Sequence, residues 1–73
     1  MLTLYRRPDC ELCGLAERAL SEAGVHEYGS VPISWDGSLA ERYGERIPVL
    51  VRGDTGAELC WPFDSGAVRR FLR

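Results

Sequence analysis

The sequence lacks the features that would indicate a membrane, secreted or nucleic-acid-binding protein. No apolar run approaches the roughly 18 residues that a membrane-spanning helix needs. The start of the chain has no charged segment followed by an apolar stretch, so we expect no signal peptide. The net charge of −2 excludes general electrostatic binding of nucleic acid. We therefore expect neither a membrane nor a nucleic acid among the partners.

Cysteine is also scarce, and its count is odd. The three cysteines are Cys10, Cys13 and Cys60, whereas small secreted scaffolds typically carry about four to eight. An odd count without an export signal is typical of a reducing compartment, so we expect a cytoplasmic protein. A disulfide between Cys10 and Cys13 would close too short a loop to stabilise the fold appreciably. That pair is therefore interpreted as chemical rather than structural.

The remaining composition is that of one small globular domain. The chain has 73 residues, 45% of them hydrophobic and 27% charged. Domains typically hold about 100–150 residues, so we expect residues 1–73 to form a single domain. No internal repeat or low-complexity segment suggests further organisation, and we expect a monomer.

Hydrophobic periodicity predicts seven elements in the order β-α-β-α-β-β-α. The apolar stripe of the first helix includes Leu12 and Leu15, and Gly24 is its expected stop. Pro32 cannot donate to a ladder, so the second strand belongs at a sheet edge. Strands are expected over 2–6, 26–33, 47–51 and 57–61, and helices over 11–23, from the N-cap Asp36 to Gly44, and after the N-cap Asp64.

These elements assemble into one simple architecture. A strand, a crossover helix and a second strand imply a parallel pair with a right-handed connection. The later hairpin adds antiparallel strands to the same sheet, which the first and last helices cover with their apolar stripes. The Pro32 strand occupies one edge. We therefore predict an α/β thioredoxin fold in its minimal form, with a four-stranded mixed sheet of order 2-1-3-4 covered by helices.

The motif that carries chemistry is a C-x-x-C, Cys10-Glu11-Leu12-Cys13, which follows a strand and starts a helix. Residues three apart inside a regular helix are too distant for a disulfide, so Cys10 is expected at the cap, after a non-helical approach through Pro8-Asp9. The partial positive charge of the helix N-terminus favours a thiolate there. We therefore predict that Cys10 is the nucleophile and that the more shielded Cys13 resolves the mixed disulfide.

Charged residues around the motif act in both directions. Arg6 and Arg7 favour the thiolate, whereas Asp9 and Glu11 oppose it. The sequence therefore leaves the net direction open.

A metal site is the main alternative use of the cysteines. Zinc takes four Cys or His ligands, and beyond the pair only Cys60 and His26 remain, on elements that the fold places apart. We therefore predict no metal held within one chain. An iron–sulfur cluster shared between two chains stays open.

Ile47-Pro48 is the second informative segment. Pro48 opens a predicted buried strand, a position where proline is tolerated. If this bond is cis, the backbone of Ile47 would lie beside Cys10 and could pair with an extended substrate. A trans proline at a strand start is the alternative.

Three segments resemble the small bacterial glutaredoxin-like proteins: YRRPDCELC at 5–13, IPVL at 47–50 and ELCWPFD at 58–64. The resemblance covers nearly the whole chain and implies a thioredoxin fold, a cis bond at Pro48, and thiol-disulfide exchange by Cys10 and Cys13. It implies no tightly bound cofactor, and a disulfide-containing protein or glutathione as substrate. The substrate-binding residues that it implies are Ile47, Pro48 and Asp64.

The same resemblance leaves room for a rival hypothesis. Trp61-Pro62-Phe63 stands where glutaredoxins carry a Gly-Gly pair that lets glutathione approach the backbone. This crowding suggests a non-enzymatic module that binds a partner or carries a cluster. Trp61 and Phe63 could form an apolar contact surface near the site or pack under the last helix.

Other residues receive structural interpretations. Cys60 is expected to fill the core as a small buried hydrophobe, and His26 to be solvated. Tyr5 either packs beside Cys10 or is simply a strand-forming tyrosine. The last helix ends in a solvated group of cations, Arg69, Arg70 and Arg73.

Overall fold

The computed structural model describes residues 1–7, 10–33, 37–43 and 46–73. The element order confirms the predicted β-α-β-α-β-β-α. The expected approach through Pro8-Asp9 and the expected caps Asp36 and Gly44 lie outside the described residues. The elements are β1 (Leu2–Arg6), α1 (Glu11–Glu22), β2 (Gly29–Pro32), α2 (Gly37–Tyr43), β3 (Val49–Arg52), β4 (Glu58–Cys60) and α3 (Ser65–Phe71).

The four strands form one mixed sheet in the order β2-β1-β3-β4, as predicted. β1 runs parallel to β2 and antiparallel to β3, with Leu4 opposite Leu50. β4 pairs antiparallel with β3 and completes the hairpin. The first three elements therefore build the parallel half of the sheet, and the hairpin adds the antiparallel half.

Both edge strands are short. β2 holds four residues and β4 three, and Pro32 lies opposite Arg6 at the end of β2. The predicted second strand, over 26–33, was too long at its start. Gly29 pairs with Thr3, and β1 extends only one residue beyond Thr3 in that direction. The residues before Gly29 therefore have almost no partner strand to pair with.

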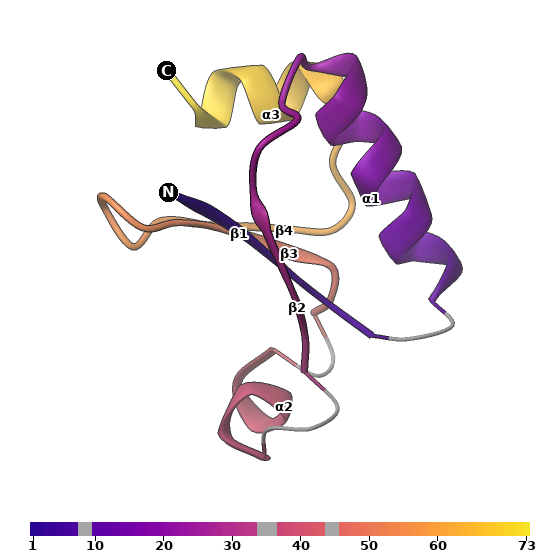
Figure 1. Cartoon of the computed structure of the whole chain (residues 1–73), viewed down its shortest axis with the longest axis vertical. Coiled ribbons are helices and arrows are strands. Elements are labelled where there is room, and N and C mark those ends of the chain that lie inside the picture. The colour runs from indigo at the N-terminus through magenta and orange to yellow at the C-terminus, as the bar shows by residue number, and fades with distance from the viewer. Residues whose placement is uncertain (8–9, 34–36, 44–45) are drawn as a thin grey trace.

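The two faces of the sheet carry separate apolar clusters because successive strand residues point to opposite faces. Leu4 and Leu50 face α1 and α3, where they pack with Leu20 and Val68. On the other face, Val49 packs with Ile33 and with Tyr43 of α2. Figure 1 shows α1 and α3 on one side of the strands and α2 on the other. The helices therefore cover the sheet as predicted.

The first helix begins and ends where the sequence indicates, but its apolar stripe is narrower. Gly24, with φ of 83°, follows the C-cap Ala23 and stops the helix in a left-handed conformation. Leu12 and Leu15 were expected in the buried stripe, but they are 45% and 49% exposed. They lie on the flank of α1, because Cys13, Ala16 and Leu20 already fill the face toward the sheet.

The last helix also begins at its predicted cap. Asp64 Oδ1 accepts a hydrogen bond from the Ala67 N–H at 2.8 Å. Phe63 is buried against α1 and α3 and meets Trp61 edge to face at 5.2 Å between ring centroids. Of the two interpretations of these aromatic residues, packing under the last helix therefore describes the structure.

Three further features complete the fold. The Ile47–Pro48 bond is cis, as the resemblance implied, and the Trp61–Pro62 bond is also cis, which was not predicted. Tyr5 stacks on Tyr43 at 4.8 Å, on the α2 face. Among the described helices, none has the length and apolar character to cross a membrane.

Candidate active site

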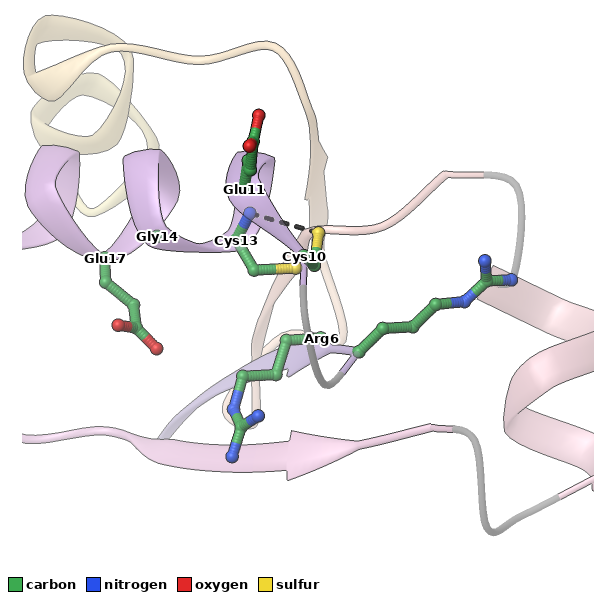
Figure 2. Close-up of a pocket in the computed structure, with 7 residues that line it drawn as sticks. Arg6, Cys10, Glu11, Cys13, Gly14 and Glu17 are labelled. Atoms are coloured by element: carbon green, nitrogen blue, oxygen red, sulfur yellow. Dashed lines mark hydrogen bonds between the residues drawn. The ribbon is translucent and has the colours of Figure 1, made fainter.

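Cys10 occupies the N-cap of α1. Its backbone is extended, with φ of −106° and ψ of 112°, so the residue lies outside the regular helix as predicted. Its Sγ accepts a hydrogen bond from the Cys13 N–H at 3.2 Å (Figure 2). The sulfur is half-buried and carries no disulfide. One reactive atom therefore sits at the end of the helix where backbone N–H groups are unpaired.

Cys13 lies one turn further and is buried, with 3% of its surface exposed. Burial raises the pKa of the Cys13 thiol from 9.0 to about 11, and its hydrogen bond with Cys10 and the charge of Cys10 act in the same direction. A backbone hydrogen bond from Arg7 and the charge of Arg6 lower the pKa, but they do not offset burial. Cys13 is therefore a protonated thiol near neutral pH.

An open pocket of about 520 Å³ adjoins the two sulfur atoms. Arg6 and Arg7 line it at the end of β1, and Glu11 and Glu17 line it from α1. Arg6 is held in place because its Nε donates to Ser30 Oγ on β2. The pocket gives a substrate access to Cys10, and its lining residues are Arg6, Arg7, Cys10, Glu11, Cys13, Gly14 and Glu17.

The residues that the resemblance implies for substrate binding do not line this pocket. Asp64 lines a separate cavity with Phe63, Ala67 and Arg70. Pro48 is buried, and its carbonyl accepts a hydrogen bond from the Trp61 N–H at 3.1 Å. Ile47 is half-buried against the cluster on the α2 face. A role in substrate binding stays a prediction for Ile47, Pro48 and Asp64.

Three residues that line or support the pocket were not singled out from the sequence, namely Gly14, Glu17 and Ser30. The first two could have been predicted from helical spacing. Gly14 and Glu17 lie four residues after Cys10 and Cys13, so helical periodicity places each on the same side as its cysteine. The anchor of Arg6, Ser30, depends on the register between β1 and β2. That register could not be predicted from one sequence, because it depends on where β2 begins and ends.

The third cysteine and the histidine lie elsewhere. Cys60 is half-buried rather than fully buried, since β4 is an edge strand, and its Sγ accepts a hydrogen bond from Arg46 at 3.7 Å. His26 is exposed, as predicted, and lines a small cavity with Gly24 and Glu27. Within the described residues, no group of three or more His, Cys, Asp or Glu side chains could hold a metal ion.

The sheet order and the helix-capping C-x-x-C place the chain among proteins with a thioredoxin-like fold and a paired-cysteine motif. Residues 1–73 match the glutaredoxin-like domain family (DUF836), and the chain belongs to this family. The family match spans the whole chain, so it includes both cysteines and the segment around Pro48.

Solved structures of similar proteins share the fold. The X-ray structure of protein XcR50 from X. campestris is 46% identical, with a TM-score of 0.93 over 99% of this chain and 95% of that chain. The solution structure of protein Ne2328 from Nitrosomonas europaea is 29% identical, with a TM-score of 0.74 over 99% and 89% of the two chains. Both are structural genomics targets. No curated protein sequence matches the chain.

Proposed function

We propose that the protein is a thiol-disulfide oxidoreductase in which Cys10 attacks a substrate disulfide and Cys13 resolves the product. The observation that carries the proposal is the position of Cys10 Sγ, which caps α1 at 3.2 Å from the Cys13 N–H and opens onto the pocket. A sulfur at this position is close to a second thiol, reachable from solvent and hydrogen-bonded to a backbone N–H. Those are the requirements of dithiol exchange.

The reaction transfers two electrons from the dithiol to the substrate. The Cys10 thiolate attacks one sulfur of a disulfide RSSR, the S–S bond breaks, and RS⁻ leaves and takes a proton from water. Cys13 then gives its proton to water, and its sulfur attacks Cys10 Sγ in the mixed disulfide. The second RS⁻ leaves and is protonated in turn. The products are two RSH molecules and a Cys10–Cys13 disulfide.

The two thiols influence each other, and this orders the steps. Burial raises the pKa of Cys13 most, and the hydrogen bond with Cys10 and the charge of Cys10 raise it further. When Cys10 enters the mixed disulfide it loses its charge, so that influence disappears and Cys13 ionises more readily. Cys13 therefore stays protonated while Cys10 is free and becomes a nucleophile after Cys10 has reacted.

Turnover requires a thiol that reduces the Cys10–Cys13 disulfide. Glutathione or the dithiol of a protein reductant supplies the two electrons, and no tightly bound cofactor is needed for this chemistry. We propose a monomer that acts in the cytoplasm, where such thiols are kept reduced. The openness of the pocket toward solvent supports exchange with either a small thiol or a protein.

The test is to equilibrate the protein in glutathione buffers of increasing oxidation and to map its cysteines by mass spectrometry. We expect a reversible two-electron couple between Cys10 and Cys13, and a Cys13→Ser variant that accumulates a glutathione adduct on Cys10. A Cys60→Ser variant is the matched control and should keep the couple. Failure to form the Cys10–Cys13 disulfide at any potential would overturn the proposal. A coloured protein that contains iron would instead support the cluster-carrying alternative.

A further inference from the structure

We propose that Arg6, anchored by Ser30, is a positioning residue that promotes the attack of Cys13 on the mixed disulfide. The inference rests on the proposed exchange reaction and assigns a role to a residue outside the C-x-x-C motif. In this proposal Arg6 acts through Cys13, whose pocket it shares. Its expected effect is therefore confined to the second step of the reaction.

The geometry begins with the strand. Leu4 points to the sheet face that α1 covers, so Arg6, two residues further, emerges on the same face at the end of β1. Its Nε donates to Ser30 Oγ on the parallel neighbour β2. Figure 2 shows the Arg6 side chain running from the end of β1 toward β2, below the two cysteines. A mobile side chain is thus fixed at the wall of the pocket that holds both sulfur atoms.

Burial makes Cys13 the harder of the two sulfurs to ionise, because water no longer stabilises its anion. The charged or titratable groups that line the pocket with it are Arg6, Arg7, Cys10, Glu11 and Glu17. Among them, Arg6 lowers the pKa of Cys13 through its charge, and Arg7 does so through a backbone hydrogen bond. The Arg6 guanidinium is therefore the side-chain charge that opposes the effect of burial.

The second step places a negative charge where Arg6 can stabilise it. The proton of Cys13 goes to water, the Cys13 sulfur forms a bond to Cys10 Sγ, and the bond from Cys10 Sγ to the substrate sulfur breaks. The negative charge passes from Cys13 to the leaving sulfur. A fixed cation nearby stabilises the anion without having to reorganise during the reaction.

The experiment follows the two steps separately with dipyridyl disulfide, a neutral substrate whose coloured thione is released once per step. All variants carry Cys60→Ser, so that only Cys10 and Cys13 react. We expect Arg6→Gln to slow the second release about three- to tenfold at neutral pH and to move its pH profile to higher pH. The first release should change less than about twofold. Arg6→Lys, which keeps the charge, should recover most of the rate.

Two further variants separate electrostatics from structure. Arg18→Gln removes the same charge from an exposed position of α1 outside the pocket lining, and it should leave both releases unchanged. Ser30→Ala frees the Arg6 side chain and should slow only the second release, by about twofold, because the hydrogen bond is to a surface hydroxyl. Circular dichroism checks that each variant is folded.

The outcomes are distinct. Equal slowing of both releases by Arg6→Gln, or the same slowing by Arg18→Gln, would overturn the role of Arg6. If the protein with Arg6 intact gives a single release, Cys13 does not resolve the mixed disulfide, and the proposed function itself fails. A slow second release that Arg6→Lys does not recover would indicate that the shape of the arginine, rather than its charge, is responsible, and would also contradict the proposal.

Discussion

The N-termini of α1 and α3 use the same geometry for different purposes. In both, an extended N-cap residue accepts a hydrogen bond from the backbone N–H three residues on, at 3.2 Å for Cys10 and 2.8 Å for Asp64. The side-chain oxygen of Asp64 is a strong acceptor and a preferred N-cap group. A thiol is a weak acceptor and becomes a strong one only as a thiolate. One cap therefore only holds a helix in place, whereas the other is also the group to which the proposed function assigns the chemistry.

Among variants that test the difference between the two N-caps, Cys10→Ser is expected to have the largest effect. The variant should lose dithiol exchange completely, because a hydroxyl does not replace the nucleophilic sulfur. Its free energy of unfolding should change by less than about 0.5 kcal/mol, because serine is a good N-cap. Disulfide reduction and urea unfolding measure the two effects. The matched variant Asp64→Ser should keep exchange with a small disulfide, and exchange that survives Cys10→Ser would contradict the assignment.

Asp64→Ala should break the other cap. We expect a loss of about 1 kcal/mol in the free energy of unfolding, measured in urea, because the Ala67 N–H loses its acceptor. Asp64→Asn keeps an acceptor oxygen and should lose less. Glu22→Ala, at the exposed end of α1, is the control for removal of a surface carboxylate. A loss no larger than that of the control would mean that the cap contributes little.

The pH dependence of the free energy of unfolding should also distinguish the two helix N-termini, because the first turn of α1 contains the buried Cys13 thiol. The pKa of Cys13 is raised in the folded protein, from 9.0 to about 11, so the folded state holds its proton more tightly than the unfolded state does. The stability that results is complete below about pH 9 and is lost as the pH rises toward 11. Tyr28 and Tyr43, whose pKa values burial also raises, act in the same direction.

The contribution of Cys13 is therefore measured by difference. Urea unfolding over this pH range should give a flatter curve for Cys13→Ala than for the natural sequence. Cys60→Ala is the control, because it removes a thiol from β4 and leaves the pair intact. Parallel curves for Cys13→Ala and the natural sequence would show that Cys13 is not buried as a neutral thiol.

The smallest expected effect is spectroscopic. The amide resonance of Cys13 should shift as Cys10 ionises, because its N–H donates to that sulfur. The amide of Ala67 donates to Asp64 instead, so it should not respond to Cys10. A nitrogen–proton NMR titration records both, and Cys10→Ser should abolish the first shift. If the chemical shift of the Cys13 amide does not respond to Cys10, the Cys10 sulfur does not cap α1.

Much of this arrangement was predictable from local pattern. The parallel crossover, the hairpin and the edge position that Pro32 requires predicted the sheet order, and Asp64 identified the start of α3. The start of β2 was not predictable, because strand length depends on how far the partner β1 extends. The exposure of Leu12 and Leu15 was also missed, since an apolar stripe in the sequence can be wider than the face that packing covers.

The positions of the two cysteines were predictable from the sequence, whereas the contacts of the residues around them were not. Cys10 lies at the cap because a pair three residues apart requires a non-helical first member, which is a local argument. The anchoring of Arg6 by Ser30 joins residues on different strands and depends on their register. The position of Asp64 in a separate cavity depends on the path of the chain between β4 and α3. These are long-range properties that a single sequence does not fix.

The short edge strands have a consequence for the behaviour of the protein at high concentration. A long unpaired strand edge recruits strands from neighbouring molecules and leads to aggregation. Here one edge ends in a proline that has no N–H to offer, and the other is three residues long. Within the described residues, both free edges are therefore too short to offer a second copy a long ladder. Under the proposed function the protein meets other chains repeatedly, and short sheet edges reduce the tendency to join them through its sheet.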